Sequence, residues 1–232
     1  MRLRVYIGYD KREAPAARVA AKSLYQICRI KAEELHITRL QENGVVTRLA
    51  DRRGEGYQHY DLVSNARAST DFAFSRFLVP ILCQGGFALG VDCDVVFLRN
   101  PIEMLSAGVD ENKAVHVVKH APLPPAGGKM DGQAQTAYPR KNWSSVILWN
   151  TDHPANRRLT LHDVNTRSGL WLHQFGWLHD DEIGELDPAW NWLVDVNPRP
   201  AHAGIAHMTL GGPWIPGWAG GSFDKEWERR AR

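Results

Sequence analysis

The amino-acid sequence predicts an α/β fold, and two observations carry this prediction. Short apolar runs typical of strands alternate with stretches whose apolar residues recur at helical spacing, as in proteins built on an open sheet. In addition, residues 87–91 and 95–98 form near-continuous apolar runs, which are typical of strands covered on both faces. We therefore expect a mixed, mainly parallel sheet with helices on both faces.

The first elements illustrate the pattern. Residues 3–7 alternate apolar and polar side chains and lead into Gly8, which predicts a strand that ends at a turn. A helix is expected over 14–27, with Pro15 in its first turn. Further strands are expected at 36–40, 87–91, 95–98, 114–118 and 146–149, helices at 70–83 and 162–172, and mostly loop at 51–69.

Two other segments are expected to be irregular. Residues 119–140 are rich in proline and glycine, which predicts a long loop that closes over a ligand as a lid. Beyond residue 172 the chain is rich in tryptophan, glycine and proline, so we expect little regular structure up to Phe223. Pro80 should bend or shorten the 70–83 helix.

Composition excludes several classes of protein. A length of 232 residues fits one domain, and the net charge of +2, without a run of like charges, gives no nucleic-acid footprint. The three cysteines, Cys28, Cys83 and Cys93, lack the spacing of a disulfide framework or a zinc site. No apolar stretch approaches the roughly 20 residues of a membrane span. We therefore expect a soluble, cytoplasmic protein without a transmembrane segment.

The most informative motif is Asp92-Cys93-Asp94, which interrupts the apolar run between residues 87 and 98. In extended backbone, residues two apart point to the same side, so both carboxylates can converge at the end of a sheet. Burying two like charges close together is costly unless a cation joins them. The motif therefore predicts a divalent metal site, although Asp-x-Asp triplets also occur in surface loops.

The order and spacing of these motifs resemble glycosyltransferase family 8. The resemblance spans nearly the whole chain and is carried by Ile7-Gly8-Tyr9-Asp10, Phe74-Ser75-Arg76, Asp92-Cys93-Asp94, residues 142–150, His207 and Gly211-Gly212-Pro213-Trp214. It implies a GT-A fold, a nucleotide-diphosphate sugar donor, usually UDP-linked, a Mn²⁺ or Mg²⁺ ion, and transfer with retention of configuration.

The resemblance also implies roles for individual residues. Asp94 and His207 would ligate the metal, and Asp92 would contact both metal and ribose. An imidazole ligand favours Mn²⁺ over Mg²⁺. The residues expected to bind nucleotide or donor are Gly8, Tyr9, Asp10, Arg76, Asp92, Cys93, Ser144, Ser145, Gly212 and Trp214.

The sequence departs from the family pattern at two places. Asp180 and Asp181 fall where the family has Asp-Gln beside the anomeric carbon; we expect them to bind donor sugar as the catalytic pair, or else to form an acidic helix start or a solvated loop. Gly211-Gly212 replaces a basic residue before Pro-Trp, for which Arg140 or Lys141 could substitute.

The aromatic residues leave alternatives open. Trp143, Trp149 and Trp192 are expected in the core, whereas Trp214 and Trp218 fit either the core or an acceptor groove. The tail at 224–232 is expected to form a short amphipathic helix, exposed to solvent or touching a membrane.

The sequence as a whole is interpreted as a single glycosyltransferase domain, 1–232. Residues 1–118 would form its nucleotide- and metal-binding half, and residues 141–223 its donor-sugar and acceptor half. The acceptor could be a glycan, a lipid-linked molecule or a protein. Two alternatives remain: a non-catalytic module that binds a nucleotide sugar or glycan, and a sugar nucleotidyltransferase, for which the single glycine in Gly8 to Arg12 is a poor phosphate loop.

Overall fold

The computed structural model describes residues 3–28, 37–39, 50–52, 59–83, 85–121 and 139–232. A six-stranded sheet in the order β10-β8-β9-β6-β1-β2 forms its centre. All neighbouring strands are parallel except β9, which is antiparallel to both β6 and β8. The strands are β1 Arg4–Ile7, β2 Ile37–Arg39, β6 Phe87–Val91, β8 Val115–Val117, β9 Val146–Asn150 and β10 Ile183–Glu185. The predicted mixed, mainly parallel sheet is thus confirmed.

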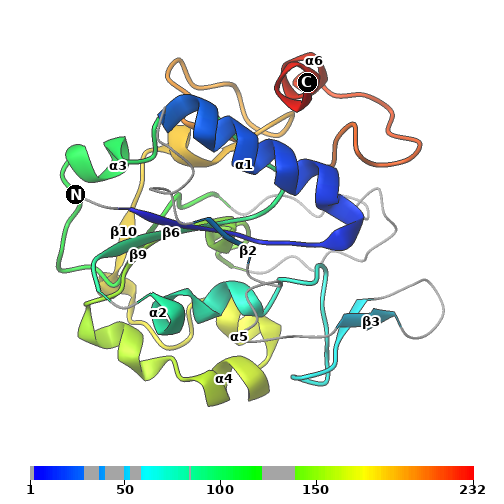
Figure 1. Ribbon diagram of the computed structural model, residues 1–232. Coiled ribbons are helices and arrows are strands. Elements are labelled where there is room, and N and C mark those ends of the chain that lie inside the picture. Colours follow the sequence, from blue (N-terminus) through cyan, green and yellow to red (C-terminus); the bar gives the residue numbers. More distant parts are fainter. Residues whose placement is uncertain (1–2, 29–36, 40–49, 53–58, 84, 122–138) are drawn as a thin grey trace.

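Helices cover both faces of this sheet (Figure 1). On one face lie α1 Ala14–Cys28 and α6 Asp224–Ala231; on the other lie α2 Val79–Leu82, α4 Leu161–Thr166 and α5 Gly169–His173, and α3 Glu103–Ser106 follows β7. Alternate residues of β9 enter different core clusters: Val146 and Leu148 pack with α1, whereas Ile147 and Trp149 pack with α2 and α5. Period-two alternation along the strands therefore builds two cores.

Two small sheets extend this framework. One has the order β11-β12-β7, with β7 Val95–Phe97, β11 Trp192–Leu193 and β12 Ile205–His207. The other joins β3 Ala50–Arg52, β4 His59–Asp61 and β5 Ala66–Arg67. The first of these sheets matters for the site, because the chain passes directly from β6 of the central sheet into β7 of the small one.

Two of the sequence predictions need correction. The 70–83 helix is reduced to a 3-10 turn, η2 Ser75–Leu78, and the single turn of α2, where Pro80 can be accommodated because the first turn needs no amide donor. The 162–172 helix is broken, since Arg167 is extended and Ser168 caps a new helix by accepting from the Trp171 amide. Short strands are present within the two segments expected to have little regular structure: β3, β4 and β5 at the first, and β10, β11 and β12 in the second.

The remaining short elements are all 3-10 turns: η1 Lys11–Glu13, η3 Trp143–Ser145, η4 Pro154–Arg158, η5 Asp180–Glu182 and η6 Pro188–Asn191. Trp149 and Trp192 are buried as expected, and Trp143 is partly buried. Residues 122–138 of the expected lid lie outside the described residues.

The expected short C-terminal helix is present as α6, and one side of it packs on the protein. α6 packs on α1, and Trp227 is 7% exposed, with its ring 5.5 Å from that of Trp214. Over the ranges that the structure describes, no helix has the length and apolar character needed to cross a bilayer.

Candidate functional site

The site lies where the chain leaves the central sheet. Asp92, Cys93 and Asp94 connect β6 to β7. The Asp92 amide donates to the Ser145 carbonyl (2.9 Å), and the Met208 amide donates to the Asp94 carbonyl (2.9 Å). Because His207 of β12 is paired with Val95, backbone hydrogen bonds bring an imidazole from a distant part of the chain beside the two aspartates.

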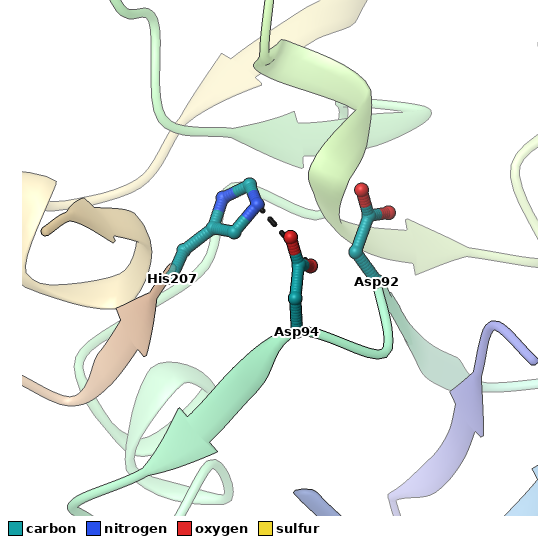
Figure 2. Close-up of side chains that lie close together, drawn as sticks. All are labelled: Asp92, Asp94 and His207. Carbon is teal, nitrogen blue, oxygen red and sulfur yellow. Dashed lines mark ion pairs between the residues drawn. The ribbon is translucent and has the colours of Figure 1, made fainter. Parts of the chain in front are cut away.

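The three side chains converge (Figure 2). One potential ligand atom from each of Asp92, Asp94 and His207 lies within 4.8 Å of the others, and His207 Nε2 lies 3.4 Å from Asp94 Oδ1. His207 is 2% exposed and Asp94 is 8% exposed. The chain turns at Cys93 and Asp94 and is not extended there, so the convergence depends on this turn.

This set of donors fits a divalent cation. Two carboxylates and one imidazole suit a first-row metal, and the remaining coordination positions would be left for ligand or water oxygens. The carboxylates are held at the edge of two buried strands, where a cation offsets their mutual repulsion. The residues predicted from the sequence as metal ligands are therefore close enough together to act as ligands to one ion.

Arg76 contacts one of the two aspartates of the cluster. Its guanidinium forms an ion pair with Asp92, donates to the Ser144 carbonyl (2.9 Å) and lies 4.8 Å over the Phe72 ring. The side chain is only 9% exposed. In this arrangement Arg76 orients the Asp92 carboxylate, and its expected place near the nucleotide or diphosphate stays a prediction.

Ser144 and Ser145 form hydrogen bonds with protein groups next to the site. Both are buried, and the Ser144 hydroxyl lies 2.6 Å from Nδ1 of His173. Burial, together with the charge of Arg76, lowers the pKa of His173 to about 3, so this imidazole is neutral near pH 7. Ser145 accepts from Asn191 and donates to the Asn142 carbonyl. The hydroxyls expected to contact the donor are thus engaged with protein groups.

The turn after β1 is built by Gly8 and Asp10. A Cβ on Gly8 would lie 2.3 Å from the Phe72 ring, so only glycine permits this packing. Asp10 is fully buried and accepts from Arg12 and from the Asp71 amide. Burial raises the pKa of Asp10, but its hydrogen bonds with Arg12 outweigh burial and the net pKa is lowered. Its carboxylate therefore supports the turn, while Tyr9 is partly exposed.

Cys93, between the two aspartates, contributes its side chain to the core. The thiol is fully buried and lies 3.7 Å from Glu13 Oε2, and burial raises its pKa well above the ordinary value. The Cys93 side chain therefore belongs to the core, and its expected contact with the donor stays a prediction.

The segment after His207 folds back on the protein. A Cβ on Gly212 would lie 2.1 Å from the Trp214 ring, so glycine lets Trp214 pack close to its own chain. Trp214 is partly buried against Trp227, and Trp218 Nε1 donates to Asp224 Oδ2 (2.8 Å). Both tryptophans thus contribute to packing while keeping some exposed surface.

Asp180 and Asp181 lie outside the Asp92–Asp94–His207 cluster. They precede β10, three strands away from β6, and the sheet register places Ile183 level with Ala88, three residues before Val91. Asp180 forms an ion pair with Arg140, and its side chain is 89% exposed. Arg140 also donates to the Gln174 carbonyl, so protein groups already hold its guanidinium.

Sequence reasoning missed two residues near the cluster. Asn191 is fully buried and hydrogen-bonds His207. His120 is 9% exposed; burial, followed by the charge of His207, lowers its pKa to about 4. The position of Asn191 between two tryptophans was the only signal available, and nothing near His120 in the sequence distinguished it from the other histidines.

Solved structures similar to this chain are glycosyltransferases. GlyE from Streptococcus pneumoniae TIGR4 aligns with a TM-score of 0.58 at 13% identity over 100% of this chain, which spans 61% of GlyE. The galactosyltransferase LgtC, solved with donor and acceptor sugar analogs, gives 0.55 at 14% identity over 98% of this chain and 94% of LgtC. Mouse xyloside xylosyltransferase 1 gives 0.52 at 14% identity, over 89% and 97%. The chain therefore has the GT-A fold.

A relative at the sequence level defines the family more closely. Protein CDI of Arabidopsis thaliana is 38% identical over 233 residues, which cover 97% of this chain and 84% of that protein. The chain belongs to the same family as Protein CDI. No family profile matches the sequence.

Proposed function

We propose that this protein is a metal-dependent glycosyltransferase that transfers a sugar from a nucleotide-diphosphate donor, with UDP-sugars favoured, to an acceptor. The observation that carries the proposal is the convergence of Asp92, Asp94 and His207 at the end of β6 in a GT-A fold. The similar solved glycosyltransferases, among them a complex with donor and acceptor analogs, support it.

The residues of the cluster would bind and orient the donor. Asp94 and His207 would hold the cation, and Asp92, oriented by Arg76, would face both cation and ribose. The donor set supports Mn²⁺ or Mg²⁺, which would supply Lewis-acid stabilisation of the diphosphate as it departs. Preorganisation of these side chains by buried hydrogen bonds reduces the rearrangement needed during reaction.

The donor sugar would bind at the turn before β10. Asp180 and Asp181 would contact the sugar, and transfer would retain the anomeric configuration, as the resemblance to glycosyltransferase family 8 implies. The Arg140–Asp180 ion pair would have to open, or orient Asp180, for this role. The acceptor would bind beside Trp214 and Trp218, whose partly exposed rings can stack on sugar faces.

A binding experiment tests the proposal. Thermal unfolding would be measured with UDP-, GDP-, CMP- and TDP-sugars, with and without Mn²⁺, for the wild type and Asp94→Asn. We expect one nucleotide sugar to raise the Tm only when Mn²⁺ is present, and this stabilisation to be absent in the variant. Failure of every donor to stabilise the wild type would reject the proposal.

A non-catalytic binding module is the second candidate, favoured by one observation. The expected catalytic pair lies outside the cluster, and Asp180 is exposed and tied to Arg140. Donor hydrolysis or transfer that disappears in Asp94→Asn would exclude the module. Metal-dependent donor binding without turnover, across varied acceptors, would favour it.

A further inference from the structure

Asn191 connects the candidate metal site to the start of β9. It ends η6, directly before β11, and its side chain is completely buried. Its Nδ2 donates to Ser145 Oγ (2.9 Å) and to the Asn142 carbonyl (3.3 Å), while its Oδ1 lies 3.0 Å from His207 Nδ1. A single amide thus bridges two segments that are far apart in sequence.

The partners of Asn191 define which way its amide points. A backbone carbonyl can only accept a hydrogen bond, so the amide nitrogen must face Asn142 and the amide oxygen must face His207. Ser145 agrees with this assignment, because its hydroxyl proton goes to the Asn142 carbonyl (2.7 Å) and its oxygen accepts from Asn191. Asn142 adopts a left-handed backbone (φ 65°), which directs this carbonyl into the network.

The orientation of Asn191 in turn sets the tautomer of His207. Since Asn191 Oδ1 is an acceptor, His207 Nδ1 must carry the proton, and the lone pair of the neutral ring is then on Nε2. Nε2 is the atom that faces Asp94 Oδ1 at 3.4 Å (Figure 2). The ring therefore presents its basic nitrogen toward the carboxylates.

We propose that Asn191 is a positioning residue, which holds His207 in the Nδ1-protonated tautomer and so prepares Nε2 to ligate the cation. The inference rests on the proposed function, because it concerns the same metal site. Hydrogen bonds to the second nitrogen of a ligating histidine commonly determine ring orientation, and their loss costs about 10- to 100-fold in metal affinity.

Two substitutions separate positioning from a purely structural role. Asn191→Leu is similar in size but removes the acceptor opposite His207 Nδ1. Asn191→Asp keeps an oxygen acceptor at this place while it loses the amide donors. We expect the leucine variant to bind Mn²⁺ about 10- to 100-fold more weakly, and the aspartate variant to stay within about tenfold of the wild type.

Ser145→Ala provides the matched control. It removes a partner of Asn191 from the same buried network but leaves the contact between Asn191 and His207 in place. Mn²⁺ affinity, measured by the EPR signal of free Mn²⁺, should fall by less than about tenfold. Equal losses of affinity in Ser145→Ala, Asn191→Asp and Asn191→Leu would overturn the proposal, because they would reflect general damage to the network.

A measurement on the metal-free protein tests the tautomer of His207 separately from metal binding and from the proposed function. Nitrogen-15 NMR of the metal-free protein, with the His207 signals assigned through His207→Gln, should show Nδ1 protonated in the wild type and a shift toward the Nε2-protonated form in Asn191→Leu. An unchanged tautomer in Asn191→Leu would overturn the inference. Failure of the wild type to bind Mn²⁺, with the tautomer shift observed, would reject the metal site and, with it, the role in metal binding.

Discussion

Two arginine–aspartate ion pairs of this protein have the same chemistry but differ in their burial and in the groups around them. Arg76 and Asp92, at the junction of β6 and β7, have side chains 9% and 17% exposed, whereas Arg140 and Asp180, before β10, have side chains 21% and 89% exposed. The first pair borders two further potential metal ligands, and the second lies outside this cluster. The same two residue types can therefore form an ion pair that supports a buried site or one that lies on a surface turn. The burial of the side chains distinguishes the two cases.

The largest expected effect concerns the stability of these pairs. Arg76→Gln should lower the free energy of unfolding by about 3 kcal/mol, since it leaves the Asp92 carboxylate without its buried countercharge. Arg140→Gln should cost less than about 1 kcal/mol, because water solvates Asp180. Urea unfolding measures both values. Similar losses of stability in the two variants would show that burial does not determine how much each ion pair contributes.

The next effect concerns metal affinity. Asp94→Asn should weaken Mn²⁺ binding on the order of a hundredfold, since it removes one of three converging charged or basic donors. Asp180→Asn should leave Mn²⁺ affinity unchanged, because Asp180 lies outside the cluster. Calorimetric titration of both variants provides the comparison, and weakened binding in Asp180→Asn would place that carboxylate in the metal site.

A smaller effect is expected on turnover. If the transferase proposal holds, Asp181→Asn should lower kcat about tenfold, the loss of one hydrogen bond to the donor sugar, with no change in Mn²⁺ affinity. Donor hydrolysis measured with saturating Mn²⁺ reports this value. A kcat equal to that of the wild type would assign Asp181 to the surface turn.

The smallest expected effect concerns the dependence of stability on pH. It is caused by a buried histidine that is neutral in the folded protein near pH 7. His116 is 2% exposed, and burial lowers its pKa to about 4. Because its folded pKa is below the unfolded value, the folded state binds fewer protons, and stability is lost as the pH falls from about 6.5 toward 4. Between pH 6 and pH 5 this histidine should account for about 1 kcal/mol of the loss.

His116→Phe should therefore reduce the dependence of stability on pH in this window. His162→Gln, at an exposed position on α4, is the matched control and should leave the dependence as in the wild type. Parallel stability curves for wild type and His116→Phe would show that another group determines the acid sensitivity.

Local patterns predicted the strands and the first helix well. Alternation in residues 3–7 and the apolar run 87–91 were confirmed as β1 and β6, because side-chain period and buried runs are properties of neighbouring residues. The expected helix 162–172 was wrong in its continuity, since the Ser168 cap starts a new helix where apolar spacing alone shows no break. Short strands such as β12 carry too few residues for a reliable pattern.

The sequence by itself determined that two aspartates follow a buried strand, which was enough to predict a metal site, and its alternating strand and helix patterns were enough to predict the α/β fold. The family resemblance singled out His207, but only the tertiary structure shows how it joins them: β12 pairs with β7 across more than a hundred residues of chain. Tertiary structure likewise decided that Arg76 orients Asp92, that Asp10 and Cys93 are buried, and that Asn191 supports His207. Such contacts depend on strand order and packing, which no local pattern contains.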